Sequence, residues 1–507
     1  MKKITWKKHH KWFGLLFCFF MLMFCLSGIV LNHRNLVGDI NVSRRYLPQS
    51  YRFKNWNNGL LRGTMPYVGR DSVQSVLLYG NGGIWQTDSL AASFTDFNDG
   101  LPAGADYRNM KGVVQMPDGE LFAAGLFGLY RCKVLEGGKA AWQEVPLPLE
   151  EEGERLSDLT SKGDMLVVVG RSRLYTAVPP YRSFRAHQLN APEGYDGKVS
   201  LFRTVWMLHS GELFGMAGKV LMDGVAIVLI LLCLTGVLYW LLPHYIRRIR
   251  RAGCNTVRSV RLLKTSLNWH DKVGRTTIVL TLFVSLTGWC LRPPVLIALV
   301  QGKVPAVPGT SLDSPNPWHD KLRMMRYDEA CGGWLLSTSE GFYALETPDD
   351  IPVEVKRTPP VSVMGLNVWQ QDGKGRWLCG SFSGMYIWDR LQGTVTDYFT
   401  GEPALEKAGA PFGKKAITGY GGDFKKECVA EYNMGTDFAP MPQELAALPM
   451  SLWNLCLEIH TGRIYTLLGQ GTLIYIFFAG LAAIWCLWSG YVIRKKKGKG
   501  TGTAAHS

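Results

Sequence analysis

The sequence predicts a membrane protein in which four transmembrane α-helices, derived from a tandem duplication, carry all-β, propeller-like extracytoplasmic inserts. Three observations support this fold class: two halves that repeat the same motifs, four long apolar runs, and two long inserts with alternating strand patterns. Of the 507 residues, 47% are hydrophobic and only 19% are charged, a balance typical of membrane proteins. Internal repetition on this scale decides the architecture before any single motif does.

The duplication is visible in two segments that begin with histidine. Residues 10–31 read HKWFGLLFCFFMLMFCLSGIVL, and residues 270–291 read HDKVGRTTIVLTLFVSLTGWCL. Each histidine is followed at the same spacing by a glycine and later by a hydroxyl–glycine pair: Gly14 and Gly274, then Ser27-Gly28 and Thr287-Gly288. A second pair of motifs also matches, each with a glycine at one shared offset: His209-Ser-Gly with Gly218, and His460-Thr-Gly with Gly469.

The basic residues predict the topology. The net charge is +15, but the excess lies in three segments without Asp or Glu, residues 1–11, 243–269 and 494–507. The positive-inside rule places these segments and both termini in the cytoplasm, so the inserts lie outside it. The charge therefore reflects topology, and no nucleic-acid partner is expected. A cleavable signal peptide is the alternative at the N-terminus, disfavoured because the duplicate of this apolar run is internal.

These signals divide the chain into eight consecutive parts. Apolar runs long enough to cross a bilayer core of roughly 30 Å alternate with the inserts and the basic segments. The predicted parts are a cytoplasmic start with helix 1 (1–33), β-rich insert 1 (34–205), a His motif with helix 2 (206–243), a basic cytoplasmic loop (244–269), helix 3 (270–294), β-rich insert 2 (295–455), a His motif with helix 4 (456–493) and a basic cytoplasmic tail (494–507).

The inserts contain a shorter repeat. An alternating strand, a small or polar break and a Gly-apolar-aromatic triplet recur about every 45 residues, a period typical of propeller blades. The units end at aromatic residues: Trp85, Tyr130, Tyr175, Tyr343 and Tyr386. One propeller of about six blades shared between both inserts is the preferred interpretation by this period. Two separate small β-domains are the alternative.

The repeated histidines suggest a cofactor site. His10, Gly14 and Gly28 fall on one helical stripe, since eighteen residues make about five turns. The second repeat predicts the same stripe from His270. An imidazole beside glycines suits a porphyrin, because absent side chains let the macrocycle approach while the imidazole reaches the iron. Glycine stripes also serve plain helix packing, but repetition in both halves favours the haem interpretation.

Topology then predicts which histidines meet. A parallel duplication with a pseudo-two-fold axis brings equivalent residues together, so His10 joins His270 and His209 joins His460. This predicts two haems, with the haem iron bound by one such pair near each membrane face. His33 is an alternative partner for His209, which would leave His460 elsewhere.

Other residues complete the list of candidates. His9 and His244 compete for the cytoplasmic site, and three arginines are candidate partners for haem propionates: Arg34, Arg292 and Arg463. No Gly-rich nucleotide fingerprint, HExxH motif or Gly-x-Ser-x-Gly elbow occurs. The sequence therefore gives no support to a flavin or NAD site or to peptidase and hydrolase chemistry.

The segments HKWFGLLFCFFMLMFCLSGIVL and IHTGRIYTLLG resemble the PepSY-associated transmembrane helix family. Its members include bacterial inner-membrane, iron-regulated reductases of ferric siderophores. The resemblance covers the helices and implies haem b, bound at the positions of His10, His209, His270 and His460. It also implies electron transfer from the cytoplasmic side to ferric complexes in the periplasm. The inserts depart from the family pattern, since no PepSY module is recognisable in them.

The resulting expectation is a di-haem protein of the bacterial inner membrane that reduces a periplasmic ferric siderophore or another ferric compound during iron uptake. Its expected partners are the lipid bilayer, the ferric substrate and an electron donor such as a quinol or a cytosolic reductase. Two other functions remain open. One is a non-enzymatic, membrane-anchored binding or sensory protein with a propeller-like interaction domain. The other, with less support, is a transporter subunit.

Overall fold

The computed structural model describes residues 3–69, 74–134, 140–149, 153–300, 302–362, 364–404, 415–469 and 471–493. The predicted basic tail 494–507 lies outside the described residues, as does His506. The chain forms two compact units. Unit 1 comprises Met1–Arg34, Gly197–Asp313 and Trp453–Ser507, and unit 2 comprises Asn35–Asp196 and Ser314–Leu452. Both inserts therefore contribute to one unit.

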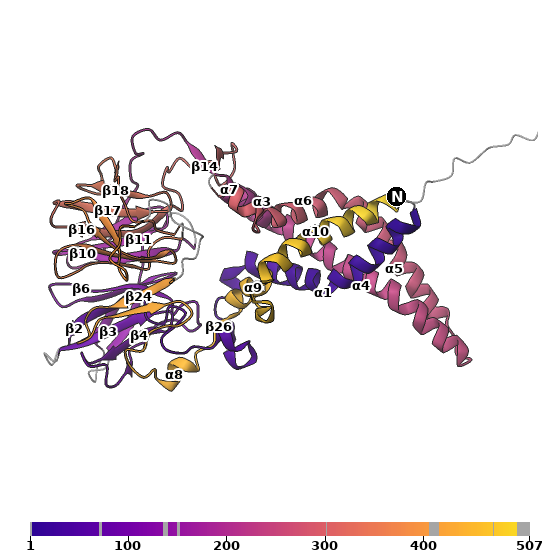
Figure 1. Cartoon of the computed structure of the whole chain (residues 1–507), viewed down its shortest axis with the longest axis horizontal. Coiled ribbons are helices and arrows are strands. Elements are labelled where there is room, and N and C mark those ends of the chain that lie inside the picture. The colour runs from indigo at the N-terminus through magenta and orange to yellow at the C-terminus, as the bar shows by residue number, and fades with distance from the viewer. Residues whose placement is uncertain are drawn as a thin grey trace, which may run out of the picture. The chain divides into compact units, whose positions relative to one another are not determined.

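Unit 1 is built from helices (Figure 1). Its main helices are α1 (Lys3–Asn32), α3 (Leu201–Ser210), α4 (Gly215–Arg251), α5 (Val257–Thr276), α6 (Ile278–Cys290), α9 (Leu452–His460) and α10 (Gly471–Val492). Four of them contact one another in a closed order, in which α1 touches α4 and α10, and α6 touches the same two helices. Short elements complete the unit: α7 (Val295–Leu299), the strand pair β14 (Lys198–Ser200) and β15 (Lys303–Pro305), and the 3-10 turns Glu212–Phe214 and Thr466–Leu468.

Three helical segments among the described residues are long and apolar enough to cross a membrane, Ile4–Asn32, Glu212–Arg251 and Ile474–Val492. The predicted third span differs, because α5 and α6 meet at a bend of 70° and count as one span only if the bent pair is taken together. The predicted helix 3 (270–294) is therefore broken by this bend, and the fourth span stays a prediction.

Local chemistry explains the bend between α5 and α6. The hydroxyls of Thr276 and Thr277 both donate to the Val273 carbonyl, at 3.1 and 2.8 Å, and compete with the backbone for this acceptor. The β-branched residues that follow also fit a helix less readily than straight side chains do. As a consequence, His270 does not share a straight helical stripe with Gly288.

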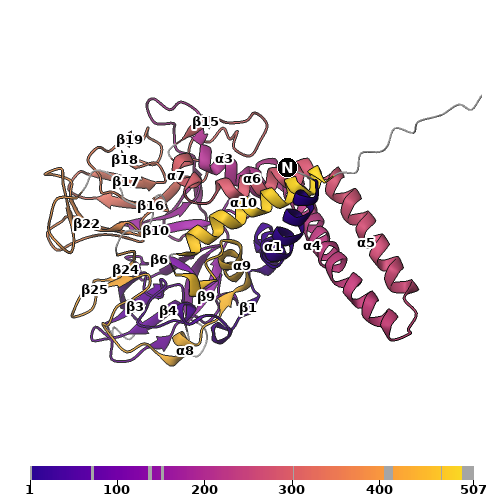
Figure 2. The same ribbon diagram turned by 45° about the vertical axis from the view of Figure 1, so that its right-hand side comes forward.

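The predicted cytoplasmic loop 244–269 is largely helical. The end of α4 and most of α5 pack side by side as an antiparallel hairpin (Figure 2). Leu242 and Ile246 are buried, and the Ser266 hydroxyl donates to the Thr235 carbonyl at 3.3 Å. This packing holds the second half of α5, which contains His270, against α4.

Unit 2 is built from antiparallel sheets. Five of them have four strands each. Three four-stranded sheets come from insert 1, and their strands are β2 (Gly63–Val68), β3 (Gln74–Gly80), β4 (Gly83–Thr87) and β5 (Thr95–Asp96); β6 (Met110–Gln115), β7 (Leu121–Gly125), β8 (Leu129–Val134) and β9 (Ala140–Val145); and β10 (Leu156–Lys162), β11 (Met165–Gly170), β12 (Leu174–Ala177) and β13 (Arg185–His187). Two come from insert 2, and their strands are β16 (Leu322–Asp328), β17 (Gly333–Thr338), β18 (Phe342–Leu345) and β19 (Val353–Glu354); and β20 (Val368–Gln371), β21 (Trp377–Ser381), β22 (Gly384–Asp389) and β23 (Thr394–Asp397). A sixth sheet has the strands β24 (Ile417–Gly421) and β25 (Cys428–Glu431).

Each predicted strand–turn–strand unit forms the central hairpin of a four-stranded sheet. In β11 and β12, for example, Val168 pairs with Tyr175 in antiparallel register. The sixth sheet was not predicted as a unit, because its segment lacks the Gly-apolar-aromatic triplet. The short pair β1 (Asn41–Val42) and β26 (Met450–Ser451) and the helices α2 (Arg34–Val37) and α8 (Gln443–Ala446) flank the sheets along the chain.

Neighbouring sheets pack face to face. In β11, Val168 belongs to a buried cluster with Phe122 of the preceding sheet, whereas Val167 belongs to a cluster with Leu336 of the following sheet. Central strands are thus buried on both faces, which explains their continuous apolar runs. First-strand contacts run from β2 through β6, β10, β16 and β20 to β24, and β24 contacts β2.

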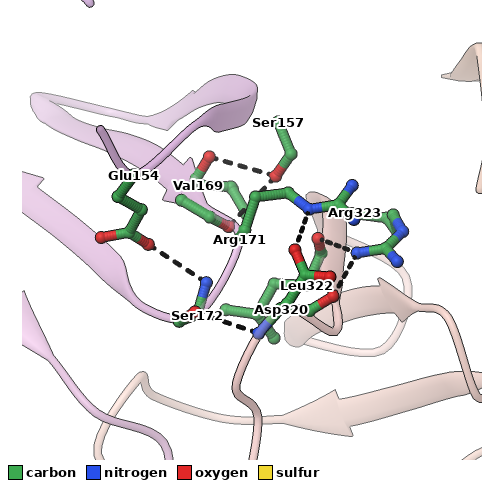
Figure 3. Close-up of polar contacts among 9 residues, drawn as sticks. Glu154, Ser157, Val169, Arg171, Ser172, Asp320, Leu322 and Arg323 are labelled. Carbon is green, nitrogen blue, oxygen red and sulfur yellow. Dashed lines mark hydrogen bonds and ion pairs between the residues drawn. The ribbon is translucent and has the colours of Figure 1, made fainter. Parts of the chain in front are cut away.

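Polar contacts join the two inserts between β11 and β16 (Figure 3). The Arg171 guanidinium donates to Asp320 at 2.9 Å, and the Ser172 hydroxyl accepts from the backbone N–H of Asp320 at 3.0 Å. Close by in the chain, buried Asp158 of insert 1 pairs with Arg326 of insert 2. The inserts, far apart in sequence, are therefore held together by ion pairs as well as by apolar packing.

Candidate histidine-pair site

The four repeated histidines lie in unit 1 as two pairs. The rings of His209 and His460 have centroids 6.0 Å apart, and those of His10 and His270 are also 6.0 Å apart. Each pair joins one histidine from each half of the chain. The structure thus brings together the residues that the pseudo-two-fold argument predicts to meet.

Different helix ends supply the four imidazoles. His209 and His460 lie near the C-termini of the short helices α3 and α9. Gly211 closes α3 in the left-handed region with φ of 83°, and Gly462 adopts φ of 74° just after α9. This explains the repeated His-Ser/Thr-Gly motif, because glycine reaches this conformation without steric cost. His10 lies on α1 and His270 on α5.

Three of the four imidazoles bond to a backbone carbonyl of a neighbouring helix through Nδ1. His460 meets the Phe24 carbonyl at 2.9 Å, His209 meets Val284 at 3.1 Å and His10 meets Cys486 at 3.0 Å. His270 has a backbone bond to Leu232. All four carbonyls lie four residues before a glycine in the sequence. One pattern therefore positions every imidazole.

A hydroxyl beside each glycine completes the pattern. The distances from Nδ1 to the hydroxyl oxygen are 3.1 Å for His460 and Ser27, 3.3 Å for His209 and Thr287, 2.9 Å for His270 and Thr235, and 3.4 Å for His10 and Ser489. Two of the hydroxyl–glycine pairs were found in the sequence. The other two, Thr235-Gly236 and Ser489-Gly490, were missed.

The glycines make room for the imidazole rings. An added Cβ would lie 2.7 Å from His209 Cε1 at Gly288 and 2.8 Å from His10 Cε1 at Gly490. The corresponding distances are 3.2 Å from His460 at Gly28 and 3.5 Å from His270 at Gly236. These glycines contact the imidazole rings directly. The sequence predicted a different role, in which the glycines leave space for a macrocycle.

The bonding pattern fixes the tautomer. A carbonyl accepts only from an N–H, so Nδ1 carries the proton and Nε2 presents a lone pair. Among the described residues, every hydrogen bond of the four rings uses Nδ1. Backbone bonds of this kind are what orient metal-ligating histidines in known metal sites.

The pairs fit a group that is ligated from two sides. Metal–nitrogen bonds of about 2 Å, with about 1 Å from nitrogen to ring centre, separate the centroids of two axial ligands by ~6 Å. The described residues contain no group of three or more His, Cys, Asp or Glu side chains placed to hold a bare metal ion. Bis-histidine ligation of haem iron needs only two protein ligands.

Electrostatics keep the His209 and His460 rings neutral. Burial, reinforced by Arg292, lowers the pKa of His209 to about 4. Burial, then the neighbouring His209 and Arg292, lowers the pKa of His460 to about 3. Neutral imidazole is the form that ligates a metal. Burial also lowers the pKa of the Arg292 guanidinium to about 10, and the charge of Arg463 acts in the same direction.

His33, the fifth predicted ligand, is engaged elsewhere. Its Nε2 lies 2.6 Å from Asp223 Oδ2 on α4, and Asn32 donates to the other oxygen of the same carboxylate at 2.9 Å. The structure pairs His209 with His460 instead. The sequence offered one signal for this contact, because Asp223 is an isolated acid in an otherwise apolar run.

The other predicted candidates also lie outside the pairs. His9 packs near Phe13 and Trp485, and the His244 ring is bonded to the Trp240 carbonyl at 3.0 Å. Of the three candidate arginines, Arg292 bonds to a pair, donating to the His460 carbonyl at 3.0 Å.

The structure corrects the predicted match between Gly218 and Gly469 in the two repeats. Gly218 and Gly469 share one offset from their histidines in the sequence. However, Gly469 closes its 3-10 turn with φ of 50° and ψ of −129°, as Gly215 does with φ of 59° and ψ of −143°. Gly215 is therefore the structural counterpart of Gly469. The three-residue shift explains why Thr235-Gly236 and Ser489-Gly490 were missed.

Residues 1–242 match the family described as PepSY-associated TM region. The match covers α1, insert 1, α3 and most of α4, just under half of the chain. Together with the apolar helices of unit 1, it identifies a membrane protein with many β-sheet segments. The search of curated proteins returned no match.

Solved structures give only distant similarities. The extracellular domain of a hybrid two component system from B. thetaiotaomicron matches 76% of this chain with 9% identity and a TM-score of 0.35. The extracellular domain of a one component system from the same organism matches 76% with 10% identity and a TM-score of 0.30. This chain covers 33% and 39% of those chains, about a third of their length.

Proposed function

We propose that the helices of unit 1 hold two haem b groups, one at each histidine pair, and that the protein reduces a ferric siderophore or another ferric compound. The main observation behind this proposal is that the four repeated histidines form two pairs, in each of which the imidazole ring centroids are 6.0 Å apart. Bound haem supplies one-electron chemistry at each pair, with a potential set by its axial ligands and surroundings. An electron from a quinol or a cytosolic reductase converts the ferric substrate to its ferrous form.

The residues around each pair perform the supporting tasks. The carbonyls of Phe24, Val284 and Cys486 hold three of the imidazoles through Nδ1, which directs Nε2 towards the iron. The adjoining glycines let these rings pack flush against the helices. Apolar side chains from α1 and α4, including buried Cys25 and Val225, exclude water from the bundle.

The proposed setting is the bacterial inner membrane. Both termini and the α4–α5 hairpin are placed in the cytoplasm, since the basic residues cluster there. Unit 2 is placed in the periplasm as a six-bladed propeller, which is supported by the cyclic order of contacts from β2 to β24. Its task in this proposal is to receive the ferric substrate.

The test is the reoxidation of the dithionite-reduced, purified protein by ferric siderophores under anaerobic stopped flow. We expect the reduced haem bands to disappear while ferrous iron accumulates, trapped by a ferrous chelator in equal amounts. His209→Ala is expected to slow this reaction at least tenfold, and His244→Ala, outside both pairs, should react like the wild type. Reduced haem that is stable in excess ferric siderophore would contradict reductase activity.

A further inference from the structure

Arg292 is a cation with an incomplete set of partners beside the His209–His460 pair. It follows α6 in the chain, and its guanidinium donates to the His460 carbonyl at 3.0 Å. A guanidinium has five N–H donors. Within the part of the chain that the structure describes, this carbonyl bond is the one polar contact of the Arg292 side chain. No described acid is bonded to the remaining donors.

The neighbouring arginines are already engaged. Arg463 donates to both carboxylate oxygens of Glu458, at 3.0 and 2.5 Å. Arg34 stacks on the Trp453 ring, with its guanidinium carbon 3.8 Å from the ring centre. In contrast to Arg463, Arg292 contacts His460 and is bonded to no acid among the described residues.

In the first half of the chain, the residue equivalent to Arg292 is bonded to an acid. Asn32 stands as far after His10 as Arg292 stands after His270. Asn32 donates to Asp223 at 2.9 Å, so that side chain and its acid satisfy each other. The counterpart of Asp223 is Phe477, since each precedes its site glycine by the same number of residues. Phe477 packs on the Trp289 ring with centroids 5.4 Å apart. The second half therefore has the cation and lacks the acid.

We infer that Arg292 binds a carboxylate beside the His209–His460 pair, and that this carboxylate is a propionate of the haem held there. The inference rests on the proposed function, because it requires haem at this pair. A guanidinium and a carboxylate form two parallel charge-assisted hydrogen bonds, which also fixes the rotation of the macrocycle. Arg292 is half-buried, and a cation partly withdrawn from water is stabilised by a counter-ion, which the propionate supplies.

The contact has an electrical consequence. A fixed positive charge favours the reduced haem, which carries one more negative charge than the oxidised form. Removing it lowers the midpoint potential of this haem alone. Among the described contacts, Arg292 bonds to His460 and to neither His10 nor His270.

The experiment compares Arg292→Gln and Arg292→Lys with Arg463→Gln, a matched loss of a nearby arginine that already has an acid. Spectroelectrochemical titration of the full-length protein is combined with haem counting and with resonance Raman of the propionate bending band. We expect Arg292→Gln to keep two low-spin haems, to lower one midpoint potential and to shift the propionate band. Arg292→Lys should keep the midpoint potential close to the wild-type value but still shift the propionate band. The reason is that lysine keeps the positive charge but cannot form the two parallel hydrogen bonds of a guanidinium. Arg463→Gln should change neither.

Different failures separate the two proposals. A wild-type protein without haem contradicts the proposed function and this inference together. Two haems in the wild type with an unshifted potential and band in Arg292→Gln contradict the propionate contact alone. An unshifted band with a raised KM for an anionic ferric chelate would instead assign the carboxylate to the substrate, which also overturns this inference. If Arg292→Gln does not fold with its haems, the propionate band of Arg292→Lys is the test. A shifted band supports the propionate contact, and an unshifted band contradicts it.

Discussion

The His209–His460 and His10–His270 pairs are built from the same parts in different surroundings. In both pairs, each ring is bonded to the backbone of a neighbouring helix, packs against a glycine there, and meets a hydroxyl through Nδ1. The first pair uses two short helix ends and has Arg292 beside it. The second pair uses α1 and the bent helix α5.

This difference shows what the duplication conserves within the chain and what it leaves free. The positions that orient an imidazole recur in all four places, whereas the charged residues nearby do not. Asn32 and Asp223 occupy the positions that Arg292 and Phe477 occupy in the other half. In the proposed function, the arginine beside the His209–His460 pair gives two haems with the same kind of ligands different potentials, and thus a direction to electron flow.

The largest expected effect comes from removing a ligand. His209→Ala or His460→Ala should leave one haem per chain out of two, and His10→Ala or His270→Ala should remove the other haem. The reason is that each pair joins only two rings, 6.0 Å apart. The pyridine haemochrome assay measures the number of haems per chain, with His244→Ala, outside both pairs, as control. Loss of both haems from every variant would show that the pairs are not independent sites.

Glycine substitutions should distinguish the pairs by graded crowding. A Cβ at Gly288 comes within 2.7 Å of His209, whereas a Cβ at Gly236 stays 3.5 Å from His270, an ordinary contact. Gly288→Ala should therefore weaken haem binding by tenfold or more, roughly the cost of losing a supporting contact around a metal ligand. Gly236→Ala should bind like the wild type. Haem titration of the apo-protein measures both, and equal losses would contradict the crowding argument.

The two haems should differ in midpoint potential. The Arg292 charge lies beside His209 and His460 but not beside the other pair, so the haem of the His209–His460 pair should have the higher potential. A redox titration should resolve two components, and the higher one should be missing in His209→Ala. Absence of the lower component in that variant would invert the assignment.

A smaller effect is expected from the hydroxyls. Thr287→Val removes the hydroxyl 3.3 Å from His209 but leaves the Val284 carbonyl at 3.1 Å. One neutral hydrogen bond contributes about 1 kcal/mol, or roughly fivefold in haem affinity. Haem competition with an apo-haem-binding protein measures this difference. A complete loss of the haem would show that the hydroxyl, rather than the carbonyl, holds the ring.

No effect on haem content is expected from His33→Ala. His33 is bonded to Asp223 at 2.6 Å, while His209 already has His460 as its partner. The variant should retain two low-spin haems, as counted by the same haemochrome assay. Loss of one haem would restore His33 as a ligand in place of His460.

The sequence predicted the meeting of the histidines because duplication and charge bias together constrain which helix ends coincide. The predicted strand pairs are present for a similar reason, since a strand, a small or polar break and a Gly-apolar-aromatic triplet recur, ending at Trp85, Tyr130 and Tyr175. Both predictions rest on patterns that repeat.

The errors fall where local chemistry overrides the repeat. The break at Thr277 depends on hydroxyls that compete for the Val273 carbonyl, a contact that hydropathy does not register. Thr235-Gly236 and Ser489-Gly490 were missed because a three-residue shift separates Gly215 from the apparent counterpart of Gly469. The engagement of His33 by Asp223 required knowing which faces of α1 and α4 meet.

The most direct test of the central claim is the visible and near-infrared spectrum of the purified wild-type protein, with haem counted per chain. The account predicts two haem b groups per chain, both low-spin, with the charge-transfer band of bis-histidine ligation in the oxidised state and sharp α and β bands after dithionite. A colourless protein produced with adequate haem would contradict it, and would leave a membrane-anchored binding protein as the better account.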